Sequence, residues 1–227
     1  MDSGRVLRNP AVDLPIPPDD LEELVEPPLS EAQIAALFEQ HPRESPINLR
    51  DVLHLELLYG AGLRVGESVA LDLGDIDVAN RVLQVRDGKG GKFRVVPLFR
   101  GVLAALDAYL AVRASLLRGP DHGALLISSK GKRCITANIQ AHLIRLSREP
   151  WSPTKRLHPH LFRHSIAVHL LRGGADVKHV QSFLGHSDIE TTRRYLKVVP
   201  GFLAEVYHKH MPEIAVKVAG IGASAGG

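Results

Sequence analysis

Two short runs of alternating apolar and polar residues, 82–86 and 93–98, constrain the fold of this 227-residue chain more than any other feature. A glycine-rich segment, 87–92, separates them, and this arrangement is typical of a β-hairpin. Elsewhere the apolar residues recur at helical spacing, and no internal repeat is visible. The sequence therefore predicts a mainly α fold with a small antiparallel β-sheet, an α+β class.

Capping residues and glycines predict where several helices begin and end. Ser30 followed by Gln33 forms a capping-box pattern, Gly60 and Gly62 punctuate the end of the second helix, and Asp176 is a suitable N-cap. We expect helices over 30–38, 47–60, 103–117, 136–148 with Thr136 as N-cap, 159–171, 177–184 and 202–210, a further helix holding Tyr195, and a short strand over 125–127.

The two ends of the chain differ in composition from the segment between them. Residues 1–29 hold seven acids, two bases and six prolines, which predicts an extended, flexible lead. Residues 213–227 are rich in alanine and glycine and predict a flexible tail, which leaves 30–212 as one domain. The lead carries a net charge of −5, so the overall +3 leaves +8 on the rest of the chain. Such a basic body favours nucleic acid as a partner, although a merely soluble basic protein has the same charge.

Several functional classes are excluded or disfavoured by the sequence. A lone cysteine, Cys134, forms no internal disulfide, so a cytoplasmic protein is expected. No apolar run has the length of a membrane span, and no Walker A motif is present. The glycines at 60, 62 and 66 follow a predicted helix rather than a strand, which argues against a dinucleotide-binding loop.

Basic side chains precede a tyrosine in an order suited to phosphodiester chemistry. Guanidinium groups present a planar fork to a phosphate, and a tyrosine hydroxyl helped by nearby bases can attack phosphorus without a metal. Any one of these side chains alone is usually structural, and twelve histidines are present, so the ordered set carries the argument. The set comprises Gly62-Leu63-Arg64-Val65-Gly66-Glu67, Lys89, His160-Leu161-Phe162-Arg163-His164, Leu184-Gly185-His186-Ser187 and Tyr195.

These motifs resemble the catalytic domain of the tyrosine recombinases, the phage integrase family, from about residue 29 to residue 212. The resemblance implies that Arg64 and Arg163 clamp the phosphate and that Tyr195 is the nucleophile. The remaining implied roles are a proton acceptor or phosphate donor for His160, a phosphate hydrogen-bond donor for His186, a general acid for Lys89 with Lys92 as its competitor, and support of Arg64 by Glu67.

The resemblance also implies a reaction and its partners. Attack on a DNA phosphate would give a 3′-phosphotyrosyl link and a Holliday junction, with neither metal nor cofactor. Double-stranded DNA, a monomer in solution that becomes a tetramer on DNA, and a second recombinase or host accessory factor are the implied partners. Typical members carry an N-terminal core-binding domain, which we expect this chain to lack because only the acidic lead precedes residue 30.

Some assignments remain open at this stage. Arg145 and Arg148, on a basic helix that also holds His142, and Arg193 and Arg194 are candidate DNA contacts, but a solvated helix face has the same composition. Zinc binding by the histidines at 158, 160 and 164 lacks a supporting cysteine or acid at ligand spacing. A type IB topoisomerase that relaxes DNA, or a DNA-binding accessory protein without catalysis, are the alternatives to a recombinase.

Overall fold

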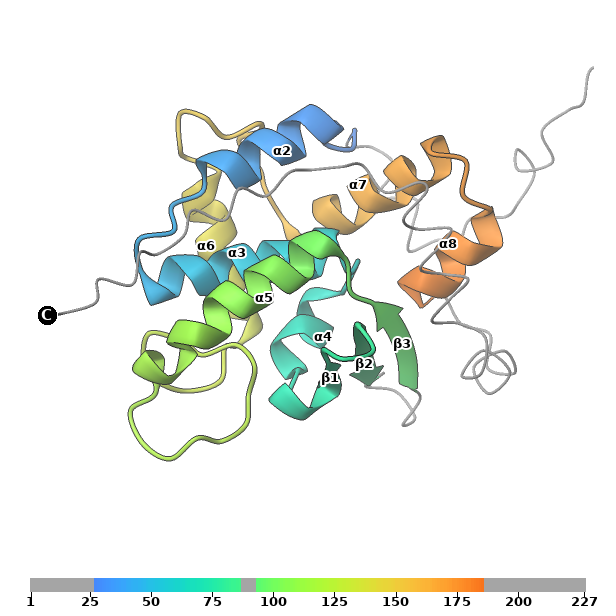
Figure 1. Ribbon diagram of the computed structural model, residues 1–227. Coiled ribbons are helices and arrows are strands. Elements are labelled where there is room, and N and C mark those ends of the chain that lie inside the picture. Colours follow the sequence, from blue (N-terminus) through green and yellow to red (C-terminus); the bar gives the residue numbers. More distant parts are fainter. Residues whose placement is uncertain (1–26, 87–92, 186–227) are drawn as a thin grey trace, which may run out of the picture.

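The computed structural model describes residues 27–86 and 93–185 and confirms the mainly helical fold with a small sheet (Figure 1). The elements in chain order are α2 (Glu31–Gln40), α3 (Pro46–Tyr59), α4 (Val65–Ala70), η3 (Leu73–Asp75), β1 (Ile76–Asp77), β2 (Val82–Arg86), β3 (Phe93–Pro97), α5 (Arg100–Arg113), η4 (Ala114–Leu116), α6 (Thr136–Leu146), α7 (Pro159–Arg172) and α8 (Val177–Leu184).

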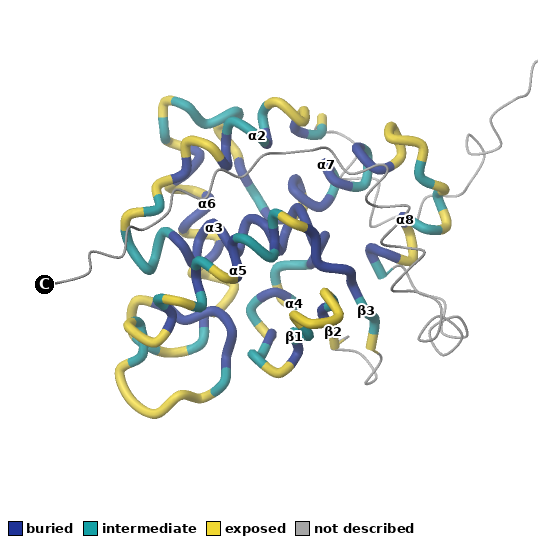
Figure 2. Tube along the Cα trace, viewed as in Figure 1, coloured by how far each residue is buried: buried dark blue, intermediate teal, exposed yellow. Residues whose placement is uncertain are grey.

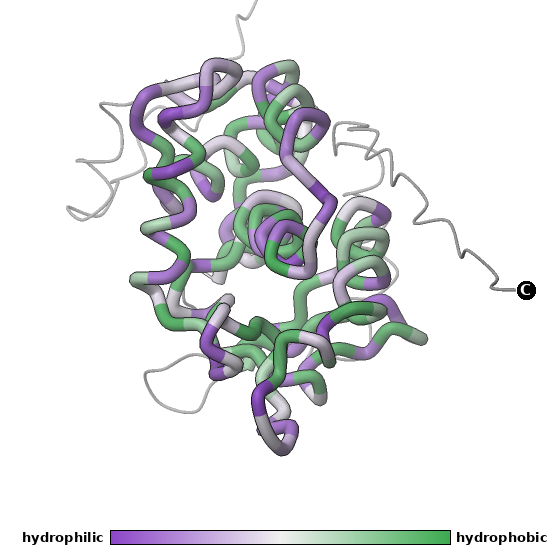
Figure 3. The backbone as a smooth tube through the Cα atoms, turned by 90° about the vertical axis from the view of Figure 1, so that its left-hand side faces the viewer, coloured by the Kyte–Doolittle hydropathy of each residue, from purple (hydrophilic) through white to green (hydrophobic). Residues whose placement is uncertain are grey.

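Helix α3 forms the centre of the fold. Its residues 49–59 are all buried, as Figure 2 shows by the dark blue trace, and it packs against α4, α5 and α7. A helix buried on every side must be apolar around most of its circumference, and seven of these eleven residues are hydrophobic. Hydrophobic and hydrophilic residues are mixed along the helical turns, as the green and purple segments in the rotated view of Figure 3 show.

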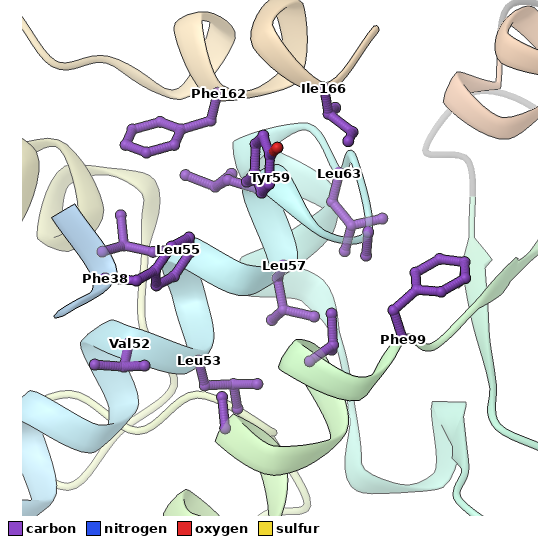
Figure 4. Packing of buried hydrophobic residues seen from close by; sticks show 14 of the residues in the cluster. Phe38, Val52, Leu53, Leu55, Leu57, Tyr59, Leu63, Phe99, Phe162 and Ile166 are labelled. Carbon is purple, nitrogen blue, oxygen red and sulfur yellow. The ribbon is translucent and has the colours of Figure 1, made fainter. Parts of the chain in front are cut away.

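The hydrophobic core links the end of α3 to α7 and α5. Figure 4 shows Tyr59 beside Phe162 and Ile166 of α7, with Phe99 approaching from the start of α5. The Tyr59 hydroxyl lies 2.9 Å from Nδ1 of the α7 residue His169. This packing fixes the orientation of α7 relative to the loop that follows α3.

The sheet has three antiparallel strands in the order β1-β2-β3. Arg86 pairs with Phe93, so the predicted hairpin strands are confirmed, and residues 87–92 connect them outside the described range. The strand expected over 125–127 is wrong, since Ile127 forms only an isolated bridge with Arg133. The segment is nevertheless buried, and the Tyr109 hydroxyl accepts from the Ile127 N–H at 3.1 Å, which satisfies that buried donor. The third strand is β1, which sequence patterning did not predict.

The predicted helix ends hold with small shifts. Ser30 and Gln33 form the expected capping box on α2, and the Asp176 carboxylate accepts from the Lys178 N–H at 2.7 Å at the start of α8. Thr136 is the first helical residue of α6 rather than its N-cap, a position that Ile135 occupies. None of the helices in the two described ranges is long and apolar enough to cross a bilayer.

Candidate active site

The loop between α3 and α4 presents Arg64 at the surface of the domain. Leu63 is fully buried, and its N–H donates to the Leu57 carbonyl at 3.0 Å, so the loop backbone is anchored directly before Arg64. Arg64 then occupies the N-cap position of α4, while its side chain remains 42% exposed. The expected turn after a helix is therefore confirmed, with the addition that a short new helix begins at this arginine.

Glu67, one turn into α4, is the carboxylate that organises this region. Its Oε2 accepts from the Arg64 N–H at 2.8 Å, and its Oε1 accepts from Arg64 NH1 at 3.3 Å. Arg94 of β3 makes shorter bonds to the same two oxygens, NH1 to Oε1 at 2.6 Å and NH2 to Oε2 at 2.7 Å. Glu67 thus contacts Arg64 as the resemblance implies, but its principal ion-pair partner is Arg94.

The charge on Glu67 is stabilised despite its burial. Desolvation raises the pKa of this carboxyl, but the hydrogen bonds and charge of Arg94, the Arg64 N–H and the charge of Arg163 outweigh that effect. The net pKa of Glu67 is lowered, so the group is a carboxylate at neutral pH. The side chains of Arg64 and Arg94 therefore share the Glu67 carboxylate, and the Arg64 side chain remains partly exposed.

Arg163 lies at the meeting point of α7, α8 and the Arg64 loop. It is 7% exposed, and its guanidinium donates from NH1 to the Gly62 carbonyl and from NH2 to the Leu184 carbonyl. Arg163 therefore ties the end of α8 to the loop that holds Arg64.

The other predicted site residues in the described part of the chain differ in exposure from Arg163. His160 is exposed in the first turn of α7, three residues before Arg163. Arg145 and Arg148 are exposed, although Arg145 NH2 also donates to Asp51 Oδ2 at 3.3 Å. His142 is 4% exposed, so its expected place on a groove-facing surface is wrong. Its face of α6 packs inward because Ile139, Leu143 and Leu146 lie on the same side.

Several predicted residues lie outside the described residues. These are Lys89 and Lys92 between β2 and β3, and His186, Arg193, Arg194 and Tyr195 after α8. Their proposed roles stay predictions.

Two of the four tyrosines fall in the described part of the chain, and both are unsuited to attack a substrate. Tyr59 and Tyr109 are at most 1% exposed. Burial raises the pKa of Tyr109 to about 12 and also raises that of Tyr59. Each hydroxyl is also engaged, that of Tyr109 donating to the Leu125 carbonyl at 3.1 Å. These observations agree with the prediction that neither is the nucleophile.

A metal site is not evident in the part of the chain that the structure describes. Within residues 27–86 and 93–185, no group of three or more His, Cys, Asp or Glu side chains is arranged to hold a metal ion.

Arg94 is the residue of this site that sequence reasoning missed. It pairs in register with Val85, which is 1% exposed, and paired residues of an antiparallel ladder point to the same face. An arginine on the buried face of a strand needs a buried anion. The sequence signal for Arg94 was therefore its position opposite the apolar Val85. This position becomes apparent only when the two strands of the hairpin are aligned residue by residue.

Replacing Gly62 with alanine is expected to lower the free energy of unfolding by about 1–3 kcal/mol. Gly62 has φ +59°, and a Cβ there would lie 2.8 Å from the Phe183 ring. Gly66→Ala is the matched control, because that glycine lies in α4 with no atom within 4 Å of an added Cβ. We expect Gly66→Ala to be neutral or stabilising in urea unfolding. Equal effects of the two variants would contradict the close packing of this loop on α8.

An exposed arginine supported by a carboxylate and linked through the fold to a second, buried arginine is suited to binding a phosphate and stabilising charge on it. The chain belongs to the phage integrase family, whose sequence model matches residues 28–200. This family is the one that the sequence motifs resemble, so the resemblance is confirmed.

Curated relatives support the same assignment. Tyrosine recombinase XerC of Myxococcus xanthus is 39% identical over 186 residues, covering 79% of this chain and 61% of XerC. Tyrosine recombinase XerD of Mycobacterium tuberculosis is 42% identical over 168 residues, covering 73% of this chain and 53% of XerD. The chain thus spans little more than half the length of these relatives.

Solved structures agree in fold. The crystal structure of XerA recombinase matches with a TM-score of 0.62 at 29% identity, covering 82% of this chain and 64% of XerA. XerH site-specific recombinase bound to its difH substrate before cleavage matches with a TM-score of 0.59 at 22% identity, covering 74% of this chain and 49% of XerH. The second likeness concerns the fold alone.

Proposed function

We propose that this protein is a site-specific DNA recombinase that cuts and rejoins DNA through a covalent tyrosine intermediate. The observation that carries the proposal is the convergence of Arg64, Glu67 and Arg163 at the junction of α4, α7 and α8. Membership of the phage integrase family and identity above 35% to tyrosine recombinases XerC and XerD support it.

In the proposed reaction the Tyr195 hydroxyl attacks phosphorus and displaces the 5′-hydroxyl, which leaves a 3′-phosphotyrosyl bond. Arg64 and Arg163 would stabilise charge on the non-bridging oxygens, because preorganised cations act most strongly where charge develops. His160 would accept the tyrosine proton or donate to the phosphate; in the latter case a phosphate oxygen or water would take that proton. His186 would donate to a non-bridging oxygen, and Lys89 would protonate the leaving oxygen. The 5′-hydroxyl of another strand reverses the step, so bond energy is retained and no nucleotide is consumed.

The proposed partner is double-stranded DNA in the cytoplasm, bound through the face that includes α6. This helix contains no acidic residue, Arg145 is exposed on it, and Arg148 is exposed just after its end. Paired strand exchange requires two cut duplexes, so we propose a monomer in solution and a tetramer on DNA, with a second recombinase or accessory factor as a further partner. Phosphate contacts of this kind make binding strongly dependent on salt.

The test is formation of SDS-resistant protein–DNA adducts on nicked duplexes from DNA flanking its own gene, at low salt. We expect adducts with the wild-type protein and none with Tyr195→Phe, because phenylalanine lacks the attacking oxygen. Tyr207→Phe is the matched control and is expected to behave like wild type.

The alternatives are distinguished by the adduct assay together with a relaxation assay on supercoiled plasmid. Relaxation of supercoiled plasmid without strand exchange would indicate a topoisomerase. DNA binding without adducts in any variant would indicate an accessory protein and would contradict the proposal.

A further inference from the structure

We propose that Arg94 is a positioning residue that holds the charge of Glu67, so that the Arg64 guanidinium stays available for a DNA phosphate. The inference rests on the proposed function, since it concerns the arginine that would contact the phosphate.

The two arginines compete for the same carboxylate oxygens. At Oε1, Arg94 NH1 lies at 2.6 Å and Arg64 NH1 at 3.3 Å. At Oε2, Arg94 NH2 lies at 2.7 Å, and the other donor is the backbone N–H of Arg64 at 2.8 Å. Arg94 therefore makes the bidentate pair, which is the strong form of this interaction, and the Arg64 side chain keeps one long bond.

Burial favours Arg94 in this competition. The side chain of Arg94 is 14% exposed, compared with 42% for Arg64 and 9% for Glu67. Arg94 Nε is buried without a hydrogen-bond partner within the two described ranges. The guanidinium thus aims both terminal nitrogens at Glu67 even though this orientation leaves Nε unsatisfied, which identifies Glu67 as the group that determines its position.

Arg94 also contacts the end of α8. Gly185 has φ +73°, and a Cβ on it would lie 2.9 Å from Cδ and NH1 of Arg94. The missing side chain at Gly185 therefore makes room for the guanidinium. Arg163 binds the neighbouring Leu184 carbonyl, so both arginines support the same helix end.

Loss of Arg94 would redirect Arg64. A buried carboxylate that loses its main counter-ion draws in the nearest remaining cation, because an unpaired buried charge is strongly unfavourable. The Arg64 guanidinium already reaches Oε1 and is mobile enough at 42% exposure to close on Glu67. The phosphate-binding fork would then be occupied by an internal carboxylate.

This mechanism predicts an unusual pattern in a double-mutant cycle. Arg94→Ala is expected to slow single-turnover cleavage of the nicked duplex by at least about 30-fold. Glu67→Gln alone is expected to slow it by about 3-fold to 10-fold, because support of Arg64 weakens. In Arg94→Ala/Glu67→Gln no carboxylate remains to capture Arg64, so the rate should recover above that of Arg94→Ala, to within about 2-fold of Glu67→Gln.

Arg86→Ala is the matched control for loss of an arginine–carboxylate pair in the sheet. Arg86 of β2 bonds Asp75 at 2.6 Å, but its side chain is 59% exposed. We expect its cleavage rate to stay within about 2-fold of wild type. DNA affinity and thermal midpoint are measured for every variant, so that a loss of rate is separated from a loss of binding or folding.

The outcomes separate the inference from the proposed function. Cleavage by the double variant as slow as or slower than by Arg94→Ala, or an unchanged rate in Arg94→Ala, would overturn the role of Arg94 while leaving the recombinase proposal intact. Absence of wild-type adducts would overturn both. If Arg94→Ala does not fold, Arg94→Lys replaces it, and the same recovery on adding Glu67→Gln is required.

Discussion

Replacing Arg163 with lysine is expected to slow DNA cleavage by at least about 100-fold and to lower the free energy of unfolding by about 2–4 kcal/mol. The guanidinium of Arg163 is buried and donates to the Gly62 and Leu184 carbonyls at once. A lysine ammonium is a compact point charge on a flexible stem and does not reproduce the planar fork between them. The measurements are single-turnover cleavage of the nicked duplex and urea unfolding.

Arg64→Lys is the informative comparison, because the two arginines differ in how the fold uses them. Arg64 is 42% exposed and makes one side-chain bond of 3.3 Å, so its replacement should change the unfolding free energy by less than about 1 kcal/mol. Its cleavage rate should fall as strongly as that of Arg163→Lys. An Arg163→Lys protein with wild-type stability would show that the two carbonyl bonds do not hold α8 in place.

The expected double effect of Arg163 follows from its position. Residues that bind a phosphate must be held rigidly, and here the same guanidinium that would face substrate also joins two segments far apart in the sequence. Arg94 reaches the same helix end from β3. The end of α8, directly before the predicted His186, is thus held by the buried Arg163 and contacted by the partly buried Arg94.

Local signals in the sequence predicted most of the helices and the hairpin. The capping box at Ser30 and the N-cap at Asp176 depend on residues within three positions of each other, so they can be recognised without tertiary structure. The same holds for the hairpin strands, whose register places Arg86 opposite Phe93. The Arg64 and Arg163 motifs were recognised through a resemblance, and the fold brings them together.

Long-range pairing explains what the sequence did not predict. Arg94 and Glu67 are 27 residues apart, and the sequence alone does not distinguish a partly buried arginine with a distant partner from a solvated one. His142 was likewise grouped with the basic face of its helix, because its partner is distant in the sequence. Its Nε2 lies 3.1 Å from Nε2 of His41, 101 residues away. The strand β1 has only two residues, too few for an alternating pattern.

The free energy of unfolding is expected to be highest near pH 6.5. A buried glutamate lowers it above this pH, and buried histidines lower it below this pH. On the alkaline side the group is Glu56 of α3, which is 5% exposed. Gly101 of α5 leaves space for it, since a Cβ there would lie 2.7 Å from Oε1. Burial raises the pKa of Glu56 to about 8 from an ordinary 4.5, although the charge of Arg43 partly opposes this.

The sign of the Glu56 effect follows from proton linkage. Between pH 4.5 and about pH 8 the folded protein keeps a proton that the unfolded chain has released. The contribution of Glu56 to stability therefore falls as pH rises through this window, by at most about 1.4 kcal/mol per pH unit, and above pH 6.5 the buried histidines no longer oppose it.

Buried histidines produce the opposite slope in acid. Burial lowers the pKa of His142 to about 4, and it also lowers the pKa values of His41, His54 and His169. Asp51 lies 3.6 Å from His142 but is already bound by Arg50 at 2.9 Å, so it does not hold a proton on the imidazole. The unfolded chain takes up these protons below about pH 6.5, so stability falls as pH decreases.

One of these histidines connects the acid response to the candidate active site. His54 of α3 lies 3.0 Å from the Ser68 hydroxyl, which itself donates to the Val65 carbonyl at 2.9 Å. The ring nitrogen must therefore donate to Ser68, which fixes a neutral tautomer and joins α3 to the helix that begins after Arg64. Protonation of His54 would charge a fully buried ring at this joint.

Glu56→Gln tests the alkaline half of this prediction. Glutamine keeps the shape and does not ionise, so the variant is expected to exceed wild type by about 2–4 kcal/mol in unfolding free energy at pH 8 and to match it near pH 4.5. Glu39→Gln, on the exposed face of α2, is the control and should follow wild type at every pH. Urea unfolding between pH 4 and pH 9 measures all three proteins. A Glu56→Gln curve parallel to wild type would mean that Glu56 is already ionised in the folded state, with Arg43 as its counter-ion, and the alkaline slope would then require another group.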